Sequence, residues 1–372
     1  MPSLQLGDLS VKLPIVQGGM GVGISLCRLA SAVAEQGCMG VISAAGIGRL
    51  QPDFRQDLRA ADERALIGQI RDARRMSDGA LGVNLMMALS DFENLFRVVV
   101  EERADAAFIG AGLLVRAPSS VAVDRIRDCA TKIIPKVSSA KAARVIFASW
   151  DRHYGCVPDG VVVEGPAAGG HLGFSRRQLE GEPPCLESIL AETLEAMSPF
   201  QQRYGRKIPV IAAGGIFTGK DIRCIMEQGA SGVKMGTRFV ATNECDADRA
   251  FKQAYVDCST KDLMFIDSPV GLPGRAIRSP LLEAVERGET RPLNCLWRCL
   301  RSCDVTNAPY CIARALMHAK RGDLREGFAF AGENAPLVKS IVSVRELVAE
   351  LVEEFRLSLG ANCATVPELH RA

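Results

Sequence analysis

The chain contains only four histidines, and one of them stands in a setting that suits proton transfer. His171 follows the glycine pair at 169–170, shortly after a strand-like apolar run. Glycines carry no side chain, so they let the imidazole project into a pocket, and an imidazole exchanges a proton near neutral pH. We therefore predict that His171 is a catalytic acid or base; the alternative is a loop histidine bonded to a carbonyl. We expect His318 and His370 to be structural or exposed, and His153 is a weaker candidate for the same pocket.

Two glycine turns each follow an apolar run and precede the start of a helix. Gly214 and Gly215 come before a helix start at Thr218, and Gly236 and Thr237 follow the last apolar run. Glycine lets the backbone come close to a ligand, and free N–H groups at a helix start attract anions. Two such turns at consecutive strand ends are typical of the phosphate site of an α/β barrel, so we predict a phosphate-bearing ligand. The alternative is that they are only tight turns.

Three further segments offer groups that suit a flat heterocyclic ring. The stretch at 18–23 is rich in glycine but lacks the spacing of a dinucleotide-binding fingerprint, so we expect its backbone to lie against the ring. Asn84 can donate and accept hydrogen bonds at once, which suits the amide-like edge of a flavin. Lys136 would bring a positive charge that stabilises the reduced, anionic ring. The alternatives are an asparagine bonded to local backbone and a solvated lysine.

Four cysteines lie close together in the sequence: Cys295, Cys299, Cys303 and Cys311. Residues four apart share one face of a helix, and four thiolates can bind an iron–sulfur cluster or zinc. The spacing is not the common pair separated by two residues. We carry metal binding as a hypothesis, with iron–sulfur ahead of zinc, beside the alternative of free, partly buried thiols that pack a lid helix.

The elements that must position these residues alternate regularly. Short, continuous apolar runs, typical of strands buried on both faces, alternate with longer amphipathic runs. Eight such units in roughly 245 residues match an α/β fold of the (β/α)8 barrel type; the alternative is a doubly wound open sheet. Small residues gather after the runs, where a barrel has its active site. The expected strands are 13–17, 39–43, 81–85, 106–109, 132–137, 160–163, 208–212 and 231–235.

The alternation of apolar and amphipathic runs ends after about residue 245, which predicts an additional C-terminal lid or subdomain. We expect residues 1–250 to form the barrel, completed by 336–360 through a helix at 344–355, and residues 251–335 to form an inserted loop and a helical, cysteine-containing lid. The segment 265–275 is rich in Pro and Gly and predicts a long ordered loop.

Composition narrows the class of protein. The 372 residues include 45 Lys and Arg against 43 Asp and Glu, a balance that argues against a nucleic-acid binder, as do the 5% aromatic residues. No stretch is long and apolar enough to cross a membrane, and the N-terminus lacks a signal peptide, so we expect a cytoplasmic enzyme. Thirteen cysteines, an odd number with irregular spacing, indicate a reducing compartment and no disulfide framework.

Five segments resemble, in the same order, those of the nitronate monooxygenase family, formerly called 2-nitropropane dioxygenase: PIVQGGMG, GVNL, EGPAAGGHLG, PVIAAGGI and GVKMGTRF. The chain is also similar to the flavin-dependent enoyl-acyl-carrier-protein reductases of some bacteria. The resemblance spans roughly residues 10–280 and implies an FMN-binding TIM barrel in which His171 lies beside the flavin and acts on the substrate. The residues expected to hold the FMN are Gly19, Met20, Asn84, Lys136, Gly170, Gly214, Gly215, Gly236 and Thr237.

The resemblance implies an oxidoreductase that acts on a small molecule. We expect oxidation of alkyl nitronates with O₂; the alternative is an enoyl-thioester reductase that uses NAD(P)H. An IMP-dehydrogenase-like barrel would need a nucleophilic cysteine in a Gly- and Ser-rich loop, which we do not find, and a non-enzymatic flavin binder would not need His171. Neither a membrane nor a nucleic-acid partner is expected, and a homodimer is left open. Departures from the family lie at 147–156 and in the four-cysteine region, so the substrate is not fixed by the resemblance.

Overall fold

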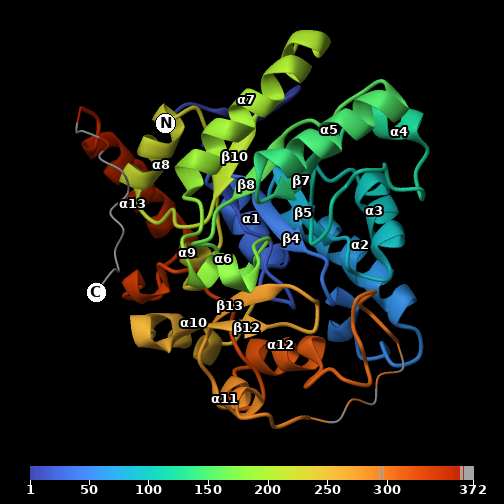
Figure 1. Ribbon diagram of the computed structural model, residues 1–372, viewed down its shortest axis with the longest axis vertical. Coiled ribbons are helices and arrows are strands. Elements are labelled where there is room, and N and C mark those ends of the chain that lie inside the picture. The colour runs from blue at the N-terminus through green and yellow to red at the C-terminus, as the bar shows by residue number, and fades with distance from the viewer. Residues whose placement is uncertain (292, 294, 296, 361–362, 364–372) are drawn as a thin grey trace.

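Eight parallel strands form a ring at the centre of the protein in a computed structural model (Figure 1). Their order around the ring is β3-β11-β10-β8-β7-β6-β5-β4, and each falls on a run predicted from the sequence, which confirms the (β/α)8 barrel. The structure describes residues 1–291, 293, 295, 297–360 and 363. The barrel strands are β3 (Ile15–Gln17), β4 (Gly40–Ser43), β5 (Leu81–Met86), β6 (Ala106–Gly110), β7 (Lys132–Val137), β8 (Val161–Glu164), β10 (Val210–Ala213) and β11 (Gly232–Met235).

The ring closes between β3 and β4 through an isolated bridge and a side chain. Val16 and Met39 form a parallel bridge. Beyond it, the backbone N–H of Val41 donates to Oε1 of the fully buried Gln17 at 2.8 Å. A buried N–H without an acceptor costs free energy, so the Gln17 amide takes the place of a ladder bond that the two strands do not form.

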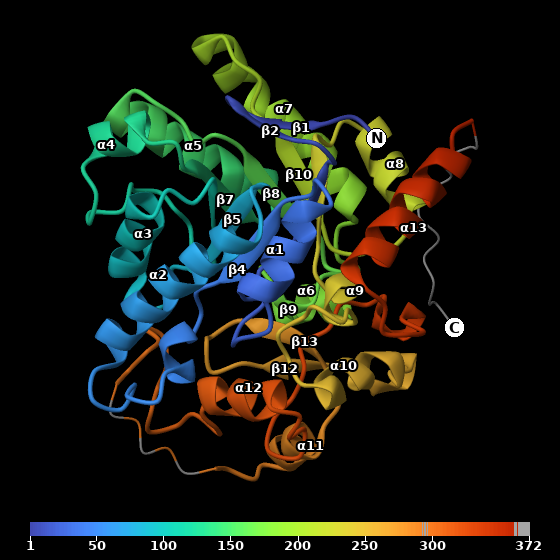
Figure 2. The same ribbon diagram turned by 180° about the vertical axis from the view of Figure 1, so that it is seen from behind.

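A hairpin that the sequence analysis did not anticipate fills one end of the barrel. Strands β1 (Leu4–Leu6) and β2 (Leu9–Val11) pair antiparallel. Figure 2 shows the two strands beside the N-terminus. Their buried side chains Leu4, Leu6 and Val11 join the apolar cluster inside the ring, and Leu4 packs against the first residue of β11. The hairpin therefore closes the end of the barrel where the strands begin, and leaves the opposite end open for a site.

Helices surround the ring, and most of them connect successive strands. Their amphipathic faces bury a large apolar cluster between the strands and the helices. The connecting helices are α1 (Cys27–Glu35), α2 (Leu58–Met76), α3 (Phe92–Glu101), α4 (Val123–Asp128), α5 (Ala140–Tyr154), α6 (Arg176–Glu180), α7 (Leu186–Tyr204) and α8 (Gly219–Glu227), with the short 3₁₀ helix η1 (Ile47–Leu50) before α2. No helix among the described residues is long and apolar enough to cross a membrane.

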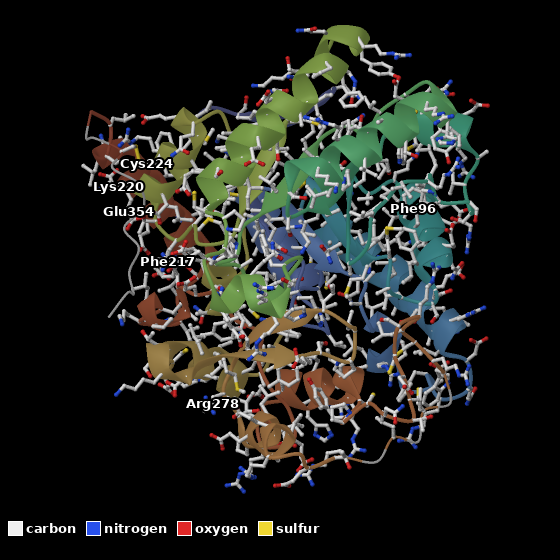
Figure 3. All side chains as sticks on the ribbon, in the orientation of Figure 1. Phe96, Phe217, Lys220, Cys224, Arg278 and Glu354 are labelled. Atoms are coloured by element: carbon white, nitrogen blue, oxygen red, sulfur yellow. A yellow bond between two sulfur atoms is a disulfide. The ribbon has the colours of Figure 1, made fainter. Side chains whose placement is uncertain are left out.

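The helix predicted near the C-terminus is present as α13 (Val344–Leu357). A capping box begins it, in which Ser343 accepts from the backbone N–H of Glu346 and the Glu346 side chain accepts from the backbone N–H of Ser343. The helix packs against α1 and α8, and Glu354 accepts a hydrogen bond from the backbone N–H of Gly219 at 2.7 Å (Figure 3). This contact ties the C-terminal helix to the barrel.

A second, smaller sheet covers the open end of the barrel, where the strands end. Strand β9 (Gly170–His171) pairs with β13 (Pro273–Ile277), which pairs with β12 (Leu263–Asp267), all antiparallel. The expectation of a long loop at 265–275 is therefore wrong, because Pro and Gly there mark the turn of a hairpin and one strand end. The remaining elements are α9 (Thr237–Val240), α10 (Arg249–Val256), η2 (Thr260–Asp262), α11 (Pro280–Glu286), α12 (Ile312–Lys320) and η3 (Ala335–Leu337). The division into a barrel and an inserted lid stays a prediction.

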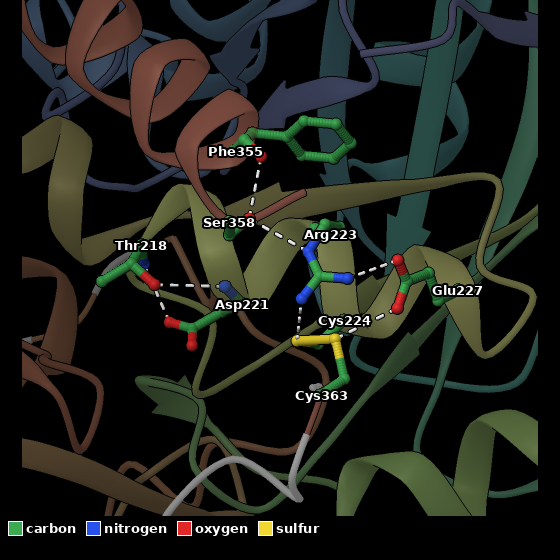
Figure 4. Close-up of a disulfide and its surroundings, with 8 residues drawn as sticks. All are labelled: Thr218, Asp221, Arg223, Cys224, Glu227, Phe355, Ser358 and Cys363. Atoms are coloured by element: carbon green, nitrogen blue, oxygen red, sulfur yellow. Dashed lines mark hydrogen bonds and ion pairs between the residues drawn. A yellow bond between two sulfur atoms is a disulfide. The ribbon is translucent and has the colours of Figure 1, made fainter. Parts of the chain in front are cut away.

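One disulfide joins Cys224 of α8 to Cys363 (Figure 4). The two Cα atoms lie 5.4 Å apart although the residues are 139 apart in sequence. The sequence analysis did not expect this bond, because spacing along a chain says nothing about which distant cysteines meet. The other eleven cysteines are free.

Candidate active site at the mouth of the barrel

A cavity of about 430 Å³ lies at the C-terminal ends of the barrel strands, between the ring and the small sheet. Every non-cysteine residue that the sequence analysis assigned to the site lines it, which is the arrangement expected of a barrel enzyme. The structure thus brings them together, while the role of each stays a prediction. They are Gly19, Met20, Asn84, Lys136, Gly170, His171, Gly214, Gly215, Gly236 and Thr237.

The two glycine turns differ in what they require. Gly214 and Gly215 have φ values of +92° and +80°, a conformation that favours glycine. Gly236 has φ −104°, which any residue can adopt, and a Cβ there would meet only the Met20 sulfur at 3.7 Å. A side chain at Gly236 would therefore enter the cavity without disturbing the fold. No acceptor among the described residues takes the backbone N–H of Gly215, Gly236 or Thr237.

The helix start at Thr218, by contrast, is not free to bind an anion. Asp221 accepts from the backbone N–H groups of Phe217 and Thr218, at 3.0 and 2.8 Å. Glu354 takes the N–H of Gly219. The carboxylates of Asp221 and Glu354 therefore already accept the hydrogen bonds of these backbone N–H groups. The free N–H groups that suit a phosphate thus lie in the turns at Gly215 and Gly236.

The glycine at position 19 serves the packing of a neighbouring strand. A Cβ on Gly19 would lie 2.2 Å from the Cβ of Asn84, so the absence of a side chain makes room for the asparagine. The expectation that the backbone at 18–23 lies against a flat ring stays a prediction. The Asn84 amide lines the cavity, and no hydrogen-bond partner for it occurs in the described part of the chain. The buried Ser43 hydroxyl beside it also lacks one.

Three charged side chains from neighbouring parts of the ring lie at the floor of the cavity. Lys136 Nζ lies 3.0 Å from both carboxylate oxygens of Glu164. Lys234 is buried, its Nζ has no hydrogen-bond partner within the described residues, and it lies 4.2 Å from the centre of the Phe108 ring. Burial, helped by the positive charge of Lys136, lowers the pKa of Lys234 to about 7. An uncompensated buried cation is costly, so this cluster suits an acceptor that arrives with a ligand.

The sequence analysis missed Glu164 and Lys234. A signal was present for both, because each is a charged residue in a run that is otherwise apolar and buried on both faces. A charge in such a strand needs a partner or a ligand. Together with the amide of Asn84 and the space at Gly236, these groups fit a flat, polar ring that carries a phosphate.

His171 lies in β9, where Gly274 of β13 is its partner in the sheet. Nε2 is 2.7 Å from the Ser268 hydroxyl, and the edge of the ring contacts Phe330, with 4.9 Å between ring centres. Burial, with a smaller effect of the positive charge on Lys136, lowers the pKa of His171 to about 4. The imidazole is therefore neutral at pH 7 and can accept a proton. Ser268 and Phe330, which position it, were not found from the sequence.

The other histidines lie apart from the cavity. His153 is exposed near the end of α5, with Nδ1 2.7 Å from the carbonyl oxygen of Ser149. His318 lies on α12 and is 2.9 Å from a carboxylate oxygen of Asp323. His370 falls outside the described residues. This leaves His171 as the histidine that faces the cavity in the part of the chain that the structure describes.

Metal binding at the four cysteines stays a prediction: burial and, to a smaller extent, the neighbouring Cys295 and Cys311 raise the pKa of the Cys299 and Cys303 thiols. Within the described residues, no three side chains of His, Cys, Asp or Glu gather as metal ligands would. The prediction assumed a helix that places Cys295, Cys299 and Cys303 on one face, but no described helix lies between α11 and α12. Cys311 is the residue before the first turn of α12. Cys299 also lies 3.5 Å from a guanidinium nitrogen of Arg49.

A second cavity of about 400 Å³ adjoins the first. Five residues line both cavities and lie between them: Val22, Ala45, Met86, His171 and Leu316. His171 thus faces the cavity at the strand ends on one side and an additional chamber on the other.

Comparison with known proteins gives a consistent result. A family model described as nitronate monooxygenase matches residues 3–354. The nitronate monooxygenase of Pseudomonas aeruginosa is 26% identical over 391 aligned positions, which cover 94% of this chain and 97% of that protein. The structure of FabK from Thermotoga maritima superposes with a TM-score of 0.71 at 26% identity and covers 94% of both chains.

A further relative carries a different name. The (3aS,4S,5R,7aS)-5-hydroxy-7a-methyl-1-oxo-octahydro-1H-indene-4-carboxyl-CoA dehydrogenase of Mycobacterium tuberculosis is 28% identical over 280 residues. The alignment covers 75% of this chain and 67% of that protein. It therefore spans about two thirds of the relative's length.

Proposed function

The chain belongs to the nitronate monooxygenase family, and from this premise we propose that it is an FMN-dependent enzyme that oxidises alkyl nitronates with O₂ as the electron acceptor. Membership of the family makes the chain a flavin-dependent oxidoreductase. The identity of the flavin as FMN, the nitronate substrate and the use of O₂ are the proposal. The observation that carries it is the neutral, half-buried imidazole of His171 between two adjoining cavities.

The cavity at the strand ends offers a place for each part of the cofactor. The free backbone N–H groups of Gly215, Gly236 and Thr237 suit the phosphate, since N–H groups are the usual donors to such anions. Asn84, Lys136 and Lys234 suit the polar edge of the ring, where cations stabilise added electrons. Bound flavin would accept the electrons that leave the substrate carbon.

His171 has two uses, which depend on the form of the substrate. A nitroalkane carries an acidic C–H bond next to the nitro group, and the neutral imidazole can accept that proton. A preformed nitronate has already lost it, and the ring can then hold the anion through an N–H donor. Burial also favours later release of the proton, because the charged imidazole is poorly solvated there.

The test begins with the purified protein. Denaturation should release FMN, identified by mass, and the loaded enzyme should consume O₂ when propionate 3-nitronate is added without NAD(P)H. His171→Gln should retain the flavin and lower this activity, by less than it lowers turnover of a neutral nitroalkane. An enzyme that carries FMN but leaves nitronates unchanged would rule out the nitronate assignment and leave only the flavin-dependent class.

A second candidate function is oxidoreduction of an acyl thioester. The chamber beyond His171, of about 400 Å³, is larger than a nitronate of a few carbon atoms needs. The relative from M. tuberculosis is named for a ring-bearing carboxyl-CoA compound. Fast anaerobic reduction of the flavin by NAD(P)H, followed by reoxidation with crotonyl-CoA, would favour this candidate over the first.

A further inference from the structure

The chamber beyond His171 has walls from three separate parts of the chain. Residues around η1 and the start of α2 form one wall, the loop after β5 forms the second, and residues 297–316 form the third. The inner surface is largely apolar. Its apolar side chains include Leu58, Leu89, Trp297, Leu300, Ile312 and Leu316.

Backbone hydrogen bonds hold the third wall in place. Leu300 forms an antiparallel bridge with Leu89 of the loop after β5. On either side of it, the N–H of Ser90 donates to the carbonyl oxygen of Cys299 at 3.0 Å, and the N–H of Arg301 donates to that of Ala88 at 2.8 Å. The wall is therefore a short piece of sheet added to the barrel loop, so the chamber is a formed part of the fold.

Arg49 brings an unusual cation into this apolar chamber. Its guanidinium carbon lies 6.0 Å from the centre of the Phe54 ring and 5.7 Å from that of Trp297, and Nη2 donates to the Cys299 sulfur at 3.5 Å. Nε is buried without a partner. No ion pair to Arg49 is found in the described residues, and burial raises the pKa of the Cys299 thiol, which keeps it neutral.

No acidic residue among those lining the chamber forms an ion pair with Arg49, although the positive charge of Arg49 acts on Asp62 and opposes the rise in the pKa of its carboxyl. Asp62 is buried, accepts from the backbone N–H of Gly48 at 2.6 Å, and has its pKa raised to about 6, chiefly by burial. Asp91 pairs with Arg59, with 3.9 Å between the charged atoms. Asp57 is exposed at the outer rim, with Gln56. The rim is thus polar and open to water, while the aromatic-flanked guanidinium stands inside.

We propose that this chamber binds the apolar body of the substrate, a ring or branched group of about six carbons or more, and that Arg49 donates hydrogen bonds to a carbonyl oxygen attached to that body. A free carboxylate and a thioester both offer such an oxygen. The proposal rests on the proposed function only in that His171 marks the end of the chamber where the reacting carbon lies. Arg49 is a specificity-determining residue in this scheme and takes no part in proton transfer.

The experiment measures binding to the flavin-loaded enzyme through Trp297, which lines the chamber. The second tryptophan, Trp150, is buried and donates to the Leu114 carbonyl oxygen. The probes are cyclohexanecarboxylate, its CoA thioester and acetate. Cyclohexanecarboxylate and its thioester should change the Trp297 emission at concentrations at which acetate, which lacks the apolar body, does not.

Two substitutions separate recognition from general charge. Arg49→Met keeps an apolar stem and should raise the Kd of cyclohexanecarboxylate about tenfold or more, the effect expected for one hydrogen bond to a charged group. Arg55→Met is the matched control, because Arg55 is exposed and contacts the Phe54 ring without lining the chamber. The control should change the Kd less than twofold. The thioester should lose less than the free acid on Arg49→Met, because its carbonyl oxygen carries no full charge.

A third variant tests the space. Ala313→Phe adds a ring to the chamber wall from α12 and should abolish binding of cyclohexanecarboxylate, with flavin content as the measure of folding. Equal Kd values in Arg49→Met and Arg55→Met, or no response of the wild-type enzyme to either cyclohexane probe, would overturn the proposal. Arg49-dependent binding in an enzyme without nitronate turnover would keep the chamber and remove the nitronate assignment. Nitronate turnover without binding of either cyclohexane probe would keep the nitronate assignment and remove the proposed role of the chamber.

Discussion

The Lys136 ammonium lies 3.0 Å from both oxygens of the Glu164 carboxylate. Because this carboxylate is paired with Lys136, it does not form an ion pair with Lys234. The floor of the cavity therefore holds two lysines and one glutamate, with the Lys234 nitrogen unsatisfied among the described residues. Such a floor favours ligands that bring an acceptor or negative charge.

Replacing Lys234 with Met should weaken flavin binding and make the flavin harder to reduce. The side chain keeps its apolar volume but loses a donor, so we expect the Kd for FMN to rise about tenfold. The midpoint potential should fall by roughly 30 mV, which equals about 1.4 kcal/mol for a two-electron couple. Lys132→Met is the control, because Lys132 is the first residue of β7 and lies at the opposite end of the barrel from the cavity. Unchanged affinity and potential would show that Lys234 does not face the flavin.

Replacing Gly236 with Val should give folded protein without flavin. The backbone conformation there suits any residue, and the added atoms would occupy the cavity near Met20. Circular dichroism should match the wild type while the absorbance of bound flavin is lost. Gly68→Val is the control, because a Cβ at Gly68 has no neighbour within 4 Å. Normal flavin content in Gly236→Val would place the phosphate elsewhere.

Replacing Gly214 with Ala should act on stability first. Its φ of +92° strains any other residue, and the added Cβ would lie 2.9 Å from the carbonyl oxygen of Gly165. We expect the free energy of unfolding to fall by more than about 1 kcal/mol, as measured by denaturant titration of the protein without flavin. A variant as stable as the wild type would mean that the turn rearranges at no cost.

Replacing His171 with Ala should lower the rate by ~10²–10⁴ on a neutral nitroalkane, the usual cost of losing a general base. The loss should be smaller on the preformed nitronate, which has no proton to give up. The fold and the flavin should be retained, because the side chain belongs neither to the barrel core nor to the phosphate turns. Near wild-type rates on both substrates would leave His171 with a packing role only.

The pH dependence of the wild-type enzyme offers a separate check on His171. The neutral ring is the base, and its pKa is lowered from 6.5 to about 4, so kcat/KM for a nitroalkane should stay level down to roughly pH 5 and then fall. The unfolded chain binds this proton more tightly, so the free energy of unfolding should also fall as the pH drops from 6.5 to about 4. An acidic limb of kcat/KM centred near 6.5 would contradict an imidazole with a lowered pKa at this position.

The barrel and the glycine turns could be predicted because their signals are local. Each strand is a continuous apolar run, and Gly214 and Gly215 follow one directly. The hydrogen bond that positions His171 could not be predicted, because Ser268 lies 97 residues away in the sequence. The pairing of β9 with β13 brings the two residues together. The cysteine spacing suggested a shared helix face, but the segment that carries Cys299 pairs with a barrel loop as a strand would.

The seam between β3 and β4 has a consequence for how residues of this barrel are ranked by importance. Gln17 is fully buried, lines neither cavity, and holds the seam with its amide. A shorter or apolar residue would break the ring of hydrogen bonds at that point. Selection would therefore retain a polar residue three positions before Met20 for architecture, and a survey based on invariance would count it wrongly among the groups that meet the substrate.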